Sequence, residues 1–210
     1  MIEADSGAES RAKRLRLMLR MGWYTPLLLL SIARVRETVE ADVARWRVVV
    51  EPPVSDRWTR LALLATYPEF RTLHSYRLRR AGVVSAGLAA AFAVLYPGER
   101  TLHLACSEIG PGLFIQHGFA TIVAARRVGR NCWINQQVTI GFTRPDDRPS
   151  IGDDVFVYAG AKVLGDVTVG DGACIGANAV VLEDVPPGAT AVGVPARILP
   201  PKAVRASGEG

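Results

Sequence analysis

The chain has 210 residues, of which 49% are hydrophobic, and it carries a formal net charge of +5. Its length and apolar content are sufficient for a sizeable core, which excludes an intrinsically disordered protein. The basic balance favours anionic partners, but no aromatic-rich basic stretch accompanies it, so we expect no nucleic-acid partner. The three cysteines, Cys106, Cys132 and Cys174, contain no CxxC pair, and their odd number favours a reduced, cytoplasmic protein.

Residues 1–100 are predicted to form a small α-helical domain. Between Leu15 and Tyr96, apolar residues recur every three to four positions, with arginine and glutamate between them. Two apolar runs, residues 24–34 and 81–96, are shorter than the ~18–20 residues that span a bilayer. We interpret both as helices of a soluble domain; the less favoured alternative is peripheral attachment to a membrane through a basic amphipathic face.

Residues 101–199 carry a six-residue repeat. Aliphatic side chains recur at six-residue steps, with one step of seven, at Ile109, Ile115, Ile122, Val128, Ile134 and Ile140, and then at Ile151, Val157, Val163, Val169, Ile175 and Val181. A period of six fits neither a helix nor a hairpin sheet. It is typical of a solenoid in which short strands alternate with tight corners and the aliphatic side chains point inward. Twelve such positions at three per coil predict about four coils.

The repeat is interrupted once. Ile140 and Ile151 are eleven residues apart, and the surplus lies in a polar, proline-containing segment. We expect residues 141–150 to be extruded as a loop while the coil continues beneath them. Residues 200–210 are expected to form a flexible tail.

Several motifs in the repeat carry a family resemblance. They are IQHG (115–118), VTIG (138–141), YAGAKVLGDVTVG (158–170) and VPPGATAVGVPARIL (185–199). Together they resemble the serine acetyltransferase family, closest to its members associated with surface-polysaccharide synthesis. The resemblance implies an α+β protein, with the helical domain followed by a left-handed parallel β-helix. It also implies a homotrimer, with a dimer of trimers as the alternative assembly. The co-substrate that it implies is acetyl-CoA, and no metal is expected.

His117 is the candidate catalytic residue. Acetyl transfer to a hydroxyl needs a base near neutral pH, which imidazole supplies, and His117 occupies the position of the family's catalytic histidine. It lies two residues beyond the inward Ile115, so we expect it to face outward, toward a cleft between subunits. The aspartate that orients this histidine in the family is replaced by Leu102. Of the other histidines, His74 is expected to be structural, and His103 is a weaker candidate for a site.

The resemblance also implies residues that contact the two substrates. Gln116 and Arg148 stand where the family has an aspartate and a second histidine, and Asp147 lies in the predicted loop; we expect these three to bind the acceptor. The family's CoA-side positions fall on Gly141, Ala159, Gly160, Ala177, Pro195 and Arg197, where small residues permit close approach of the pantetheine arm and Arg197 could meet its phosphates.

Three functional alternatives remain open from the sequence. The acceptor is either L-serine, favoured by the family, or a sugar hydroxyl, favoured by the changed acceptor positions. A γ-class carbonic anhydrase would need three zinc-binding histidines, and the chain has only three in total, one of them in the helical domain. A non-catalytic trimeric scaffold would use the repeat for assembly alone.

Overall fold

The computed structural model describes residues 13, 15–23 and 35–201. The chain divides into two compact units, residues 1–100 and 101–210, which are described separately. The apolar run at residues 24–34 and most of the predicted flexible tail, residues 202–210, lie outside the described residues.

The first unit is helical, as predicted. Residues 15–23 are helical, and four further helices follow: α2 (Arg36–Val50), α3 (Asp56–Thr66), α4 (Pro68–Arg80) and α5 (Val83–Leu95). Trp46 lies at the centre of this core, with its ring edge-on to Tyr67 and Phe70 at centroid distances of 5.7 and 5.2 Å. No helix within residues 13, 15–23 and 35–201 is both long and apolar enough to cross a membrane.

A charged pair is buried in the same unit. The Arg77 guanidinium donates to both carboxylate oxygens of Asp42, at 2.9 and 3.1 Å, and joins α4 to α2. Both side chains are almost fully buried. Burying these charges is tolerated because each satisfies the other, and removing either partner would leave a charge in an apolar environment.

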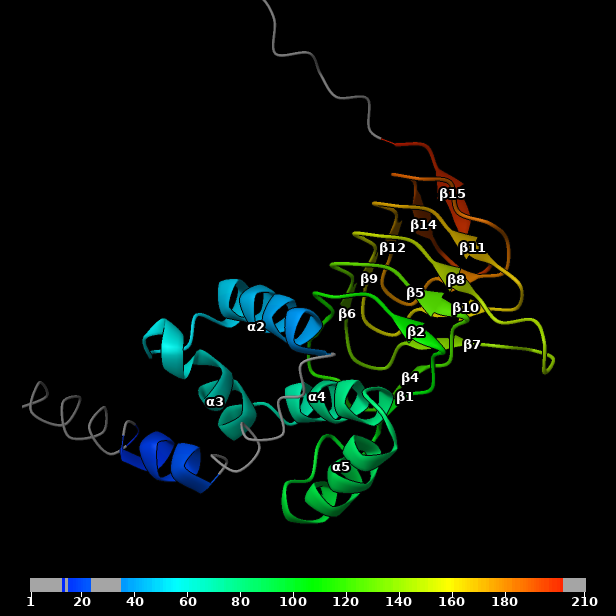
Figure 1. Cartoon of the computed structure of the whole chain (residues 1–210). Helices are drawn as coiled ribbons and strands as arrows, with labels where there is room; N and C mark the ends of the chain where they lie inside the picture. The colour runs from blue at the N-terminus through cyan, green and yellow to red at the C-terminus, as the bar shows by residue number, and fades with distance from the viewer. Residues whose placement is uncertain (1–12, 14, 24–34, 202–210) are drawn as a thin grey trace, which may run out of the picture. The chain divides into compact units, whose positions relative to one another are not determined.

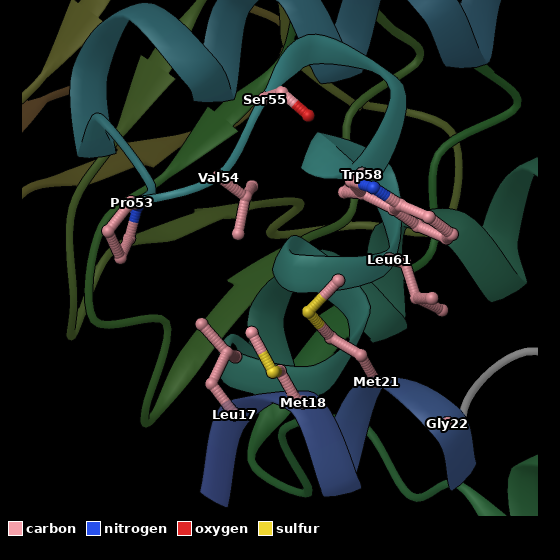
Figure 2. Close-up of a pocket in the computed structure, with 9 residues that line it drawn as sticks. All are labelled: Leu17, Met18, Met21, Gly22, Pro53, Val54, Ser55, Trp58 and Leu61. Atoms are coloured by element: carbon pink, nitrogen blue, oxygen red, sulfur yellow. The ribbon is translucent and has the colours of Figure 1, made fainter. Parts of the chain in front are cut away.

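A pocket of about 640 Å³ lies between the helical residues 15–23 and the start of α3 (Figure 2). The described residues that line it are mostly apolar, with Ser55 as the polar side chain among them. The residues are Leu17, Met18, Met21, Gly22, Pro53, Val54, Ser55, Trp58 and Leu61.

The second unit is a parallel β-helix with three sheets, one on each side (Figure 1). The first sheet contains β1 (Leu102–Leu104), β4 (Thr121–Val123), β7 (Thr139–Gly141), β10 (Lys162–Leu164) and β13 (Val180–Val181). The second contains β2 (Glu108–Ile109), β5 (Arg127–Val128), β8 (Ser150–Ile151) and β11 (Thr168–Val169). The third contains β3 (Phe114–Ile115), β6 (Trp133–Ile134), β9 (Phe156–Val157), β12 (Cys174–Ile175), β14 (Thr190–Val192) and β15 (Arg197–Leu199).

From β1 to β13 the chain visits the three sheets in strict rotation, so equivalent residues of successive coils stack; β14 and β15 both belong to the third sheet, where they pair antiparallel. In the third sheet, Ile115 pairs with Ile134, which pairs with Val157, and each is buried. Such columns remove from water the apolar side chains that one coil could not bury alone. The solenoid has about five turns, one more than the aliphatic period predicted, because β1 and β14 extend the stack beyond the regular repeat.

The prediction that Ile122 points inward was wrong. Ile122 is 43% exposed, whereas the next residue, Val123, is fully buried and pairs with the inward Ile140. The seven-residue step is therefore accommodated by a longer corner before β4, and the inward position shifts by one residue. Because side chains in a strand alternate between faces, a shift of one position exchanges the inward and outward residues.

Candidate active site

His117 lies on one edge of the prism. We define the His117 edge as the turns that follow each strand of the third sheet, at residues 116–120, 135–138, 158–161, 176–179 and 193–196. The first of these turns is longer by one residue than the next three, and His117 and Ala120 both have φ of 51°, in the left-handed region. The Phe119 N–H donates to the His117 carbonyl at 2.6 Å, which tightens the turn. The His117 side chain is exposed, as predicted for a base that must reach a substrate.

In the described part of the chain, no carboxylate orients the imidazole in the way that the family's aspartate is expected to. Leu102, at the corresponding position, is buried and pairs with Thr121 in the first sheet. Among the residues described, no side chain hydrogen-bonds the His117 ring. The left-handed backbone at His117 fixes the direction of its Cα–Cβ bond, and the side chain is exposed.

Gln116, next to His117, is held by a contact that the sequence did not reveal. The Trp133 indole Nε1–H donates to Gln116 Oε1 at 3.2 Å and to Asn135 Oδ1 at 2.7 Å. Gln116 and Asn135 are equivalent residues of successive coils, since the Gln116 N–H donates to the Ile134 carbonyl just before Asn135. The spacing of the repeat could have indicated this proximity, because both residues directly follow a strand of the third sheet.

Four of the predicted CoA-side residues share the His117 edge. Ala159, Gly160, Ala177 and Pro195 lie in its third, fourth and fifth turns, so they and the imidazole are aligned along the same edge. Pro195 follows a cis peptide bond, in the turn between β14 and β15. Gly160 has φ of 74°, and a Cβ built there would lie 2.0 Å from Asn178 Oδ1 in the next coil.

The other two CoA-side residues lie elsewhere. Arg197 is exposed on β15, in antiparallel register with Val192. Gly141 ends β7 in the first sheet and is buried against Leu164, so it belongs to a different edge from His117.

The extruded loop, residues 142–149, leaves the prism between β7 and β8, on the edge that joins the first and second sheets (Figure 1). Asp147 closes this loop. Its carboxylate accepts hydrogen bonds from the Thr143 hydroxyl and from the backbone N–H groups of Thr143 and Arg144. These bonds, that from the Thr143 hydroxyl foremost, hold the pKa of Asp147 below its ordinary value.

Arg148 also has contacts on the edge that joins the first and second sheets, which we call the loop edge. Its guanidinium lies over the Phe142 ring, 4.5 Å from the centroid, and donates to the Ala124 carbonyl at 3.4 Å. Asp147 and Arg148 thus lie on a different edge of the same protomer from His117 and Gln116. A single β-helix does not bring the predicted acceptor-binding residues together.

The remaining histidines are less suited to catalysis. Burial, together with the nearby Arg60 charge, lowers the pKa of His74 to about 3, so its buried ring is neutral at physiological pH. His103 is exposed on β1. In the described part of the chain, no group of three or more histidine, cysteine, aspartate or glutamate side chains is placed to hold a metal.

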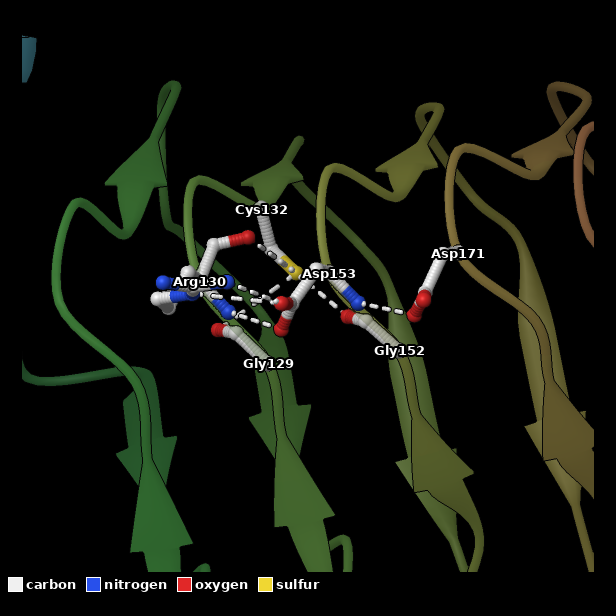
Figure 3. A network of polar contacts seen from close by, with 6 residues as sticks. All are labelled: Gly129, Arg130, Cys132, Gly152, Asp153 and Asp171. Atoms are coloured by element: carbon white, nitrogen blue, oxygen red, sulfur yellow. Dashed lines mark hydrogen bonds and ion pairs between the residues drawn. The ribbon is translucent and has the colours of Figure 1, made fainter.

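Cys132 lies in a third corner of the prism, within a network of polar contacts (Figure 3). Its thiol donates to the Gly152 carbonyl at 3.2 Å, and burial raises its pKa to about 11. In this corner the Asp153 carboxylate accepts from the Arg130 backbone and guanidinium, and Asp171 accepts from the Asp153 N–H at 2.7 Å. A buried, protonated thiol of this kind supports packing rather than nucleophilic chemistry.

Comparison with known proteins identifies the family. Residues 148–183 match the bacterial transferase hexapeptide (six repeats) family. The serine acetyltransferase of Helicobacter pylori strain J99 is 38% identical over 169 residues, which cover 73% of this chain and 92% of that protein. The chain belongs to the serine acetyltransferase family. The family's member from Synechococcus elongatus is 34% identical over 184 residues, covering 80% of this chain and 70% of that protein.

Solved structures of the family agree with this fold. Serine acetyltransferase from Neisseria gonorrhoeae in complex with serine superposes with a TM-score of 0.60 at 29% identity, over 81% of this chain and 71% of that one. A serine acetyltransferase in complex with cysteine gives a TM-score of 0.61, also at 29% identity, over 86% of this chain and 69% of that one. Together with family membership, these similarities confirm the predicted left-handed β-helix and an acyltransferase activity.

Proposed function

We propose that the protein transfers the acetyl group of acetyl-CoA to the hydroxyl of L-serine, with His117 as the general base. Family membership supports the reaction, and the exposed imidazole on the left-handed turn supports the assignment of the base. That turn is the observation on which the proposal depends most, because it directs the side chain of His117 away from the packed interior.

The proposed chemistry requires one proton acceptor. Neutral imidazole of His117 takes the hydroxyl proton as the hydroxyl oxygen attacks the thioester carbonyl. A C–O bond forms, the C–S bond breaks, and the departing thiolate of CoA recovers the proton from the imidazolium. Such general-base assistance contributes about 10²–10⁴ to the rate.

The proposed site is completed by a second protomer. Asp147 and Arg148 lie on the loop edge, whereas His117 and Gln116 lie on another edge of the same prism. If all four contact one acceptor, the His117 edge of one copy must meet the loop edge of the next. Repeating that contact around an axis closes a ring, and three copies suit a three-sided prism, which favours a homotrimer.

The CoA arm is proposed to follow the His117 edge. Ala159 and Ala177 present only methyl groups along it, which permits close approach of an extended chain. Arg197 supplies an exposed cation near the end of the edge for the CoA phosphates. The odd number of cysteines in the sequence, three, supports a reducing cytoplasm, where acetyl-CoA is available.

A thiol-release assay tests the proposal. Purified protein is supplied with acetyl-CoA and either L-serine or a panel of sugars and nucleotide sugars. The proposal predicts release of CoA that depends on L-serine and saturates with its concentration. Release with a sugar alone would replace L-serine by a sugar hydroxyl as the acceptor, and no release with any hydroxyl compound would support a non-catalytic trimer.

A further inference from the structure

The indole of Trp133 packs between two other aromatic rings beside the His117 edge. The Trp133 ring lies between Phe114, edge-on at 4.6 Å, and Phe156, stacked at 5.7 Å, on the outer face of the third sheet. Three rings in successive coils leave the indole little freedom to turn, so the direction of its N–H is fixed. That N–H donates to Gln116 and Asn135.

The indole determines which way the two amides face. An indole nitrogen donates and cannot accept, so the amide oxygens, not the amide nitrogens, of Gln116 and Asn135 must lie toward Trp133. The NH₂ group of each amide is then on the side away from the indole. Among the described residues, neither NH₂ group has an acceptor, which leaves both available to a ligand beside His117.

The described residues of the turns around these amides carry no carboxylate. The first four turns of the His117 edge, residues 116–120, 135–138, 158–161 and 176–179, contain no aspartate or glutamate. The ammonium of Lys162, which directly follows the third turn, donates to the Gln137 carbonyl in the second. Hydrogen-bond donors and one cation therefore face this part of the edge, which suits an oxygen-rich or anionic group and disfavours a substrate ammonium.

We infer that Trp133 is a positioning residue that orients Gln116 and Asn135 so that their amide NH₂ groups bind the carboxylate of the hydroxyl acceptor. This inference rests on the proposed function, and it specifies which end of the acceptor is recognised. The ammonium of L-serine makes no essential contact with this edge. Asp147, on the loop edge of the next copy, is the carboxylate proposed to contact the acceptor, and it already accepts three hydrogen bonds within its own loop. Acceptors that keep the hydroxyl and the carboxylate but lack the amino group are therefore substrates.

Two analogues separate the ends of the acceptor without adding bulk. 3-Hydroxypropanoate lacks only the amino group of L-serine, and ethanolamine lacks only the carboxylate. We expect kcat/KM for 3-hydroxypropanoate to stay within about tenfold of that for L-serine, and that for ethanolamine to fall by about 100-fold, since hydrogen bonds to a charged group each contribute about ten- to 100-fold. Equal use of the two analogues would overturn the inference.

Trp133→Phe tests the positioning role. The variant keeps a ring between Phe114 and Phe156 but lacks the N–H donor. We expect it to raise the KM for L-serine about three- to tenfold, the effect of one hydrogen bond, and to leave kcat and the KM for acetyl-CoA within about twofold. Phe156→Leu is the matched control, because it disturbs the same ring stack and keeps the donor. An equal rise in KM in Phe156→Leu would show that packing alone is responsible.

Gln116→Glu supplies an independent readout. It replaces the donating NH₂ group by an acceptor oxygen, so we expect use of 3-hydroxypropanoate to fall and use of ethanolamine to rise. An unchanged preference in this variant would contradict the inference even if Trp133→Phe fails to fold. If the wild-type protein releases no CoA with L-serine, the proposed function fails by itself; calorimetric binding of 3-hydroxypropanoate that is lost in Trp133→Phe would still support the inference, and its absence in the wild type would overturn it.

Discussion

Gly160 offers a quantitative test of how the corners are built. The sequence associated this glycine with the approach of CoA, but the structure provides two internal reasons for it. Its φ of 74° lies in the left-handed region, and a Cβ would approach Asn178 Oδ1 to 2.0 Å. The same arrangement recurs in another corner, where Gly112 lies beneath Asn131 and a Cβ would approach its Oδ1 to 2.4 Å. We therefore predict that Gly160→Ala reduces stability.

The expected loss follows from these two contributions. A left-handed conformation costs a residue with a Cβ about 1–2 kcal/mol relative to glycine. The clash is with the end of a side chain, and displacing Asn178 into a strained rotamer costs about 0.5–1.5 kcal/mol more. Gly160→Ala should thus lower the free energy of unfolding by about 1.5–3.5 kcal/mol, the sum of these two estimates.

A second substitution separates the two contributions. Asn178 itself has φ of 57°, so Asn178→Gly removes the side chain without creating a new conformational strain. In the double variant only the cost of the left-handed alanine, about 1–2 kcal/mol, should remain. Chemical denaturation followed by circular dichroism measures all four proteins of this cycle. A Gly160→Ala variant as stable as the wild type, or one that Asn178→Gly does not relieve, would refute the reasoning.

Three further predictions address the core and the loop. Asp42→Asn should cost about 3–5 kcal/mol of unfolding free energy, because it removes the counter-ion of the buried Arg77 charge. The apolar double variant Asp42→Leu with Arg77→Met should recover most of that loss, and equal losses in the two variants would contradict this. Val123→Asp should prevent folding or lower the free energy of unfolding by more than about 4 kcal/mol, whereas Ile122→Asp should change it by no more than about 0.5 kcal/mol. Thermal or chemical denaturation measures both, and the reverse order would show that Ile122 is the inward residue. The lowered pKa of Asp147 means that its contribution to loop order is complete above the ordinary aspartate value and is lost as the pH falls through the lower folded value. The backbone N–H groups of Thr143 and Arg144, which donate to Asp147, should therefore lose protection from hydrogen exchange, measured by NMR relative to the intrinsic rate, at low pH in the wild type and be unprotected at all pH values in Asp147→Ala; pH-independent protection in the wild type would contradict this.

The period of six was sufficient to predict the solenoid and most of its inward columns. Ile115, Ile134 and Val157 stack as expected because each lies at the same point of a coil. The prediction that Ile122 points inward was wrong because the six-residue period does not determine where an extra residue is placed. The one extra residue between Ile115 and Val128 can be placed in the corner or in the strand, and only the backbone of the turn at His117 decides between them.

The candidate site could be assembled from the sequence in its parts but not in its arrangement. His117 and the small residues of its edge follow from the family motifs, and their common edge follows from the rotation of the chain through three sheets. The role of Trp133 is absent from the motifs because it arises from a contact between coils, across 17 residues of sequence. Likewise, the separation of Arg148 from His117 depends on which sheets flank the loop, and this requires the complete coil.

The measurement that tests the central claim most directly is the rate of L-serine-dependent CoA release by His117→Asn. Asparagine tolerates the left-handed turn, so the backbone at φ of 51° should be kept while the base is removed. We predict that kcat falls by about 10²–10⁴, the contribution of a general base, with the unfolding midpoint unchanged. A fall of less than about tenfold in a folded variant would contradict the assignment of His117 as the base, since general-base assistance contributes at least about 100-fold.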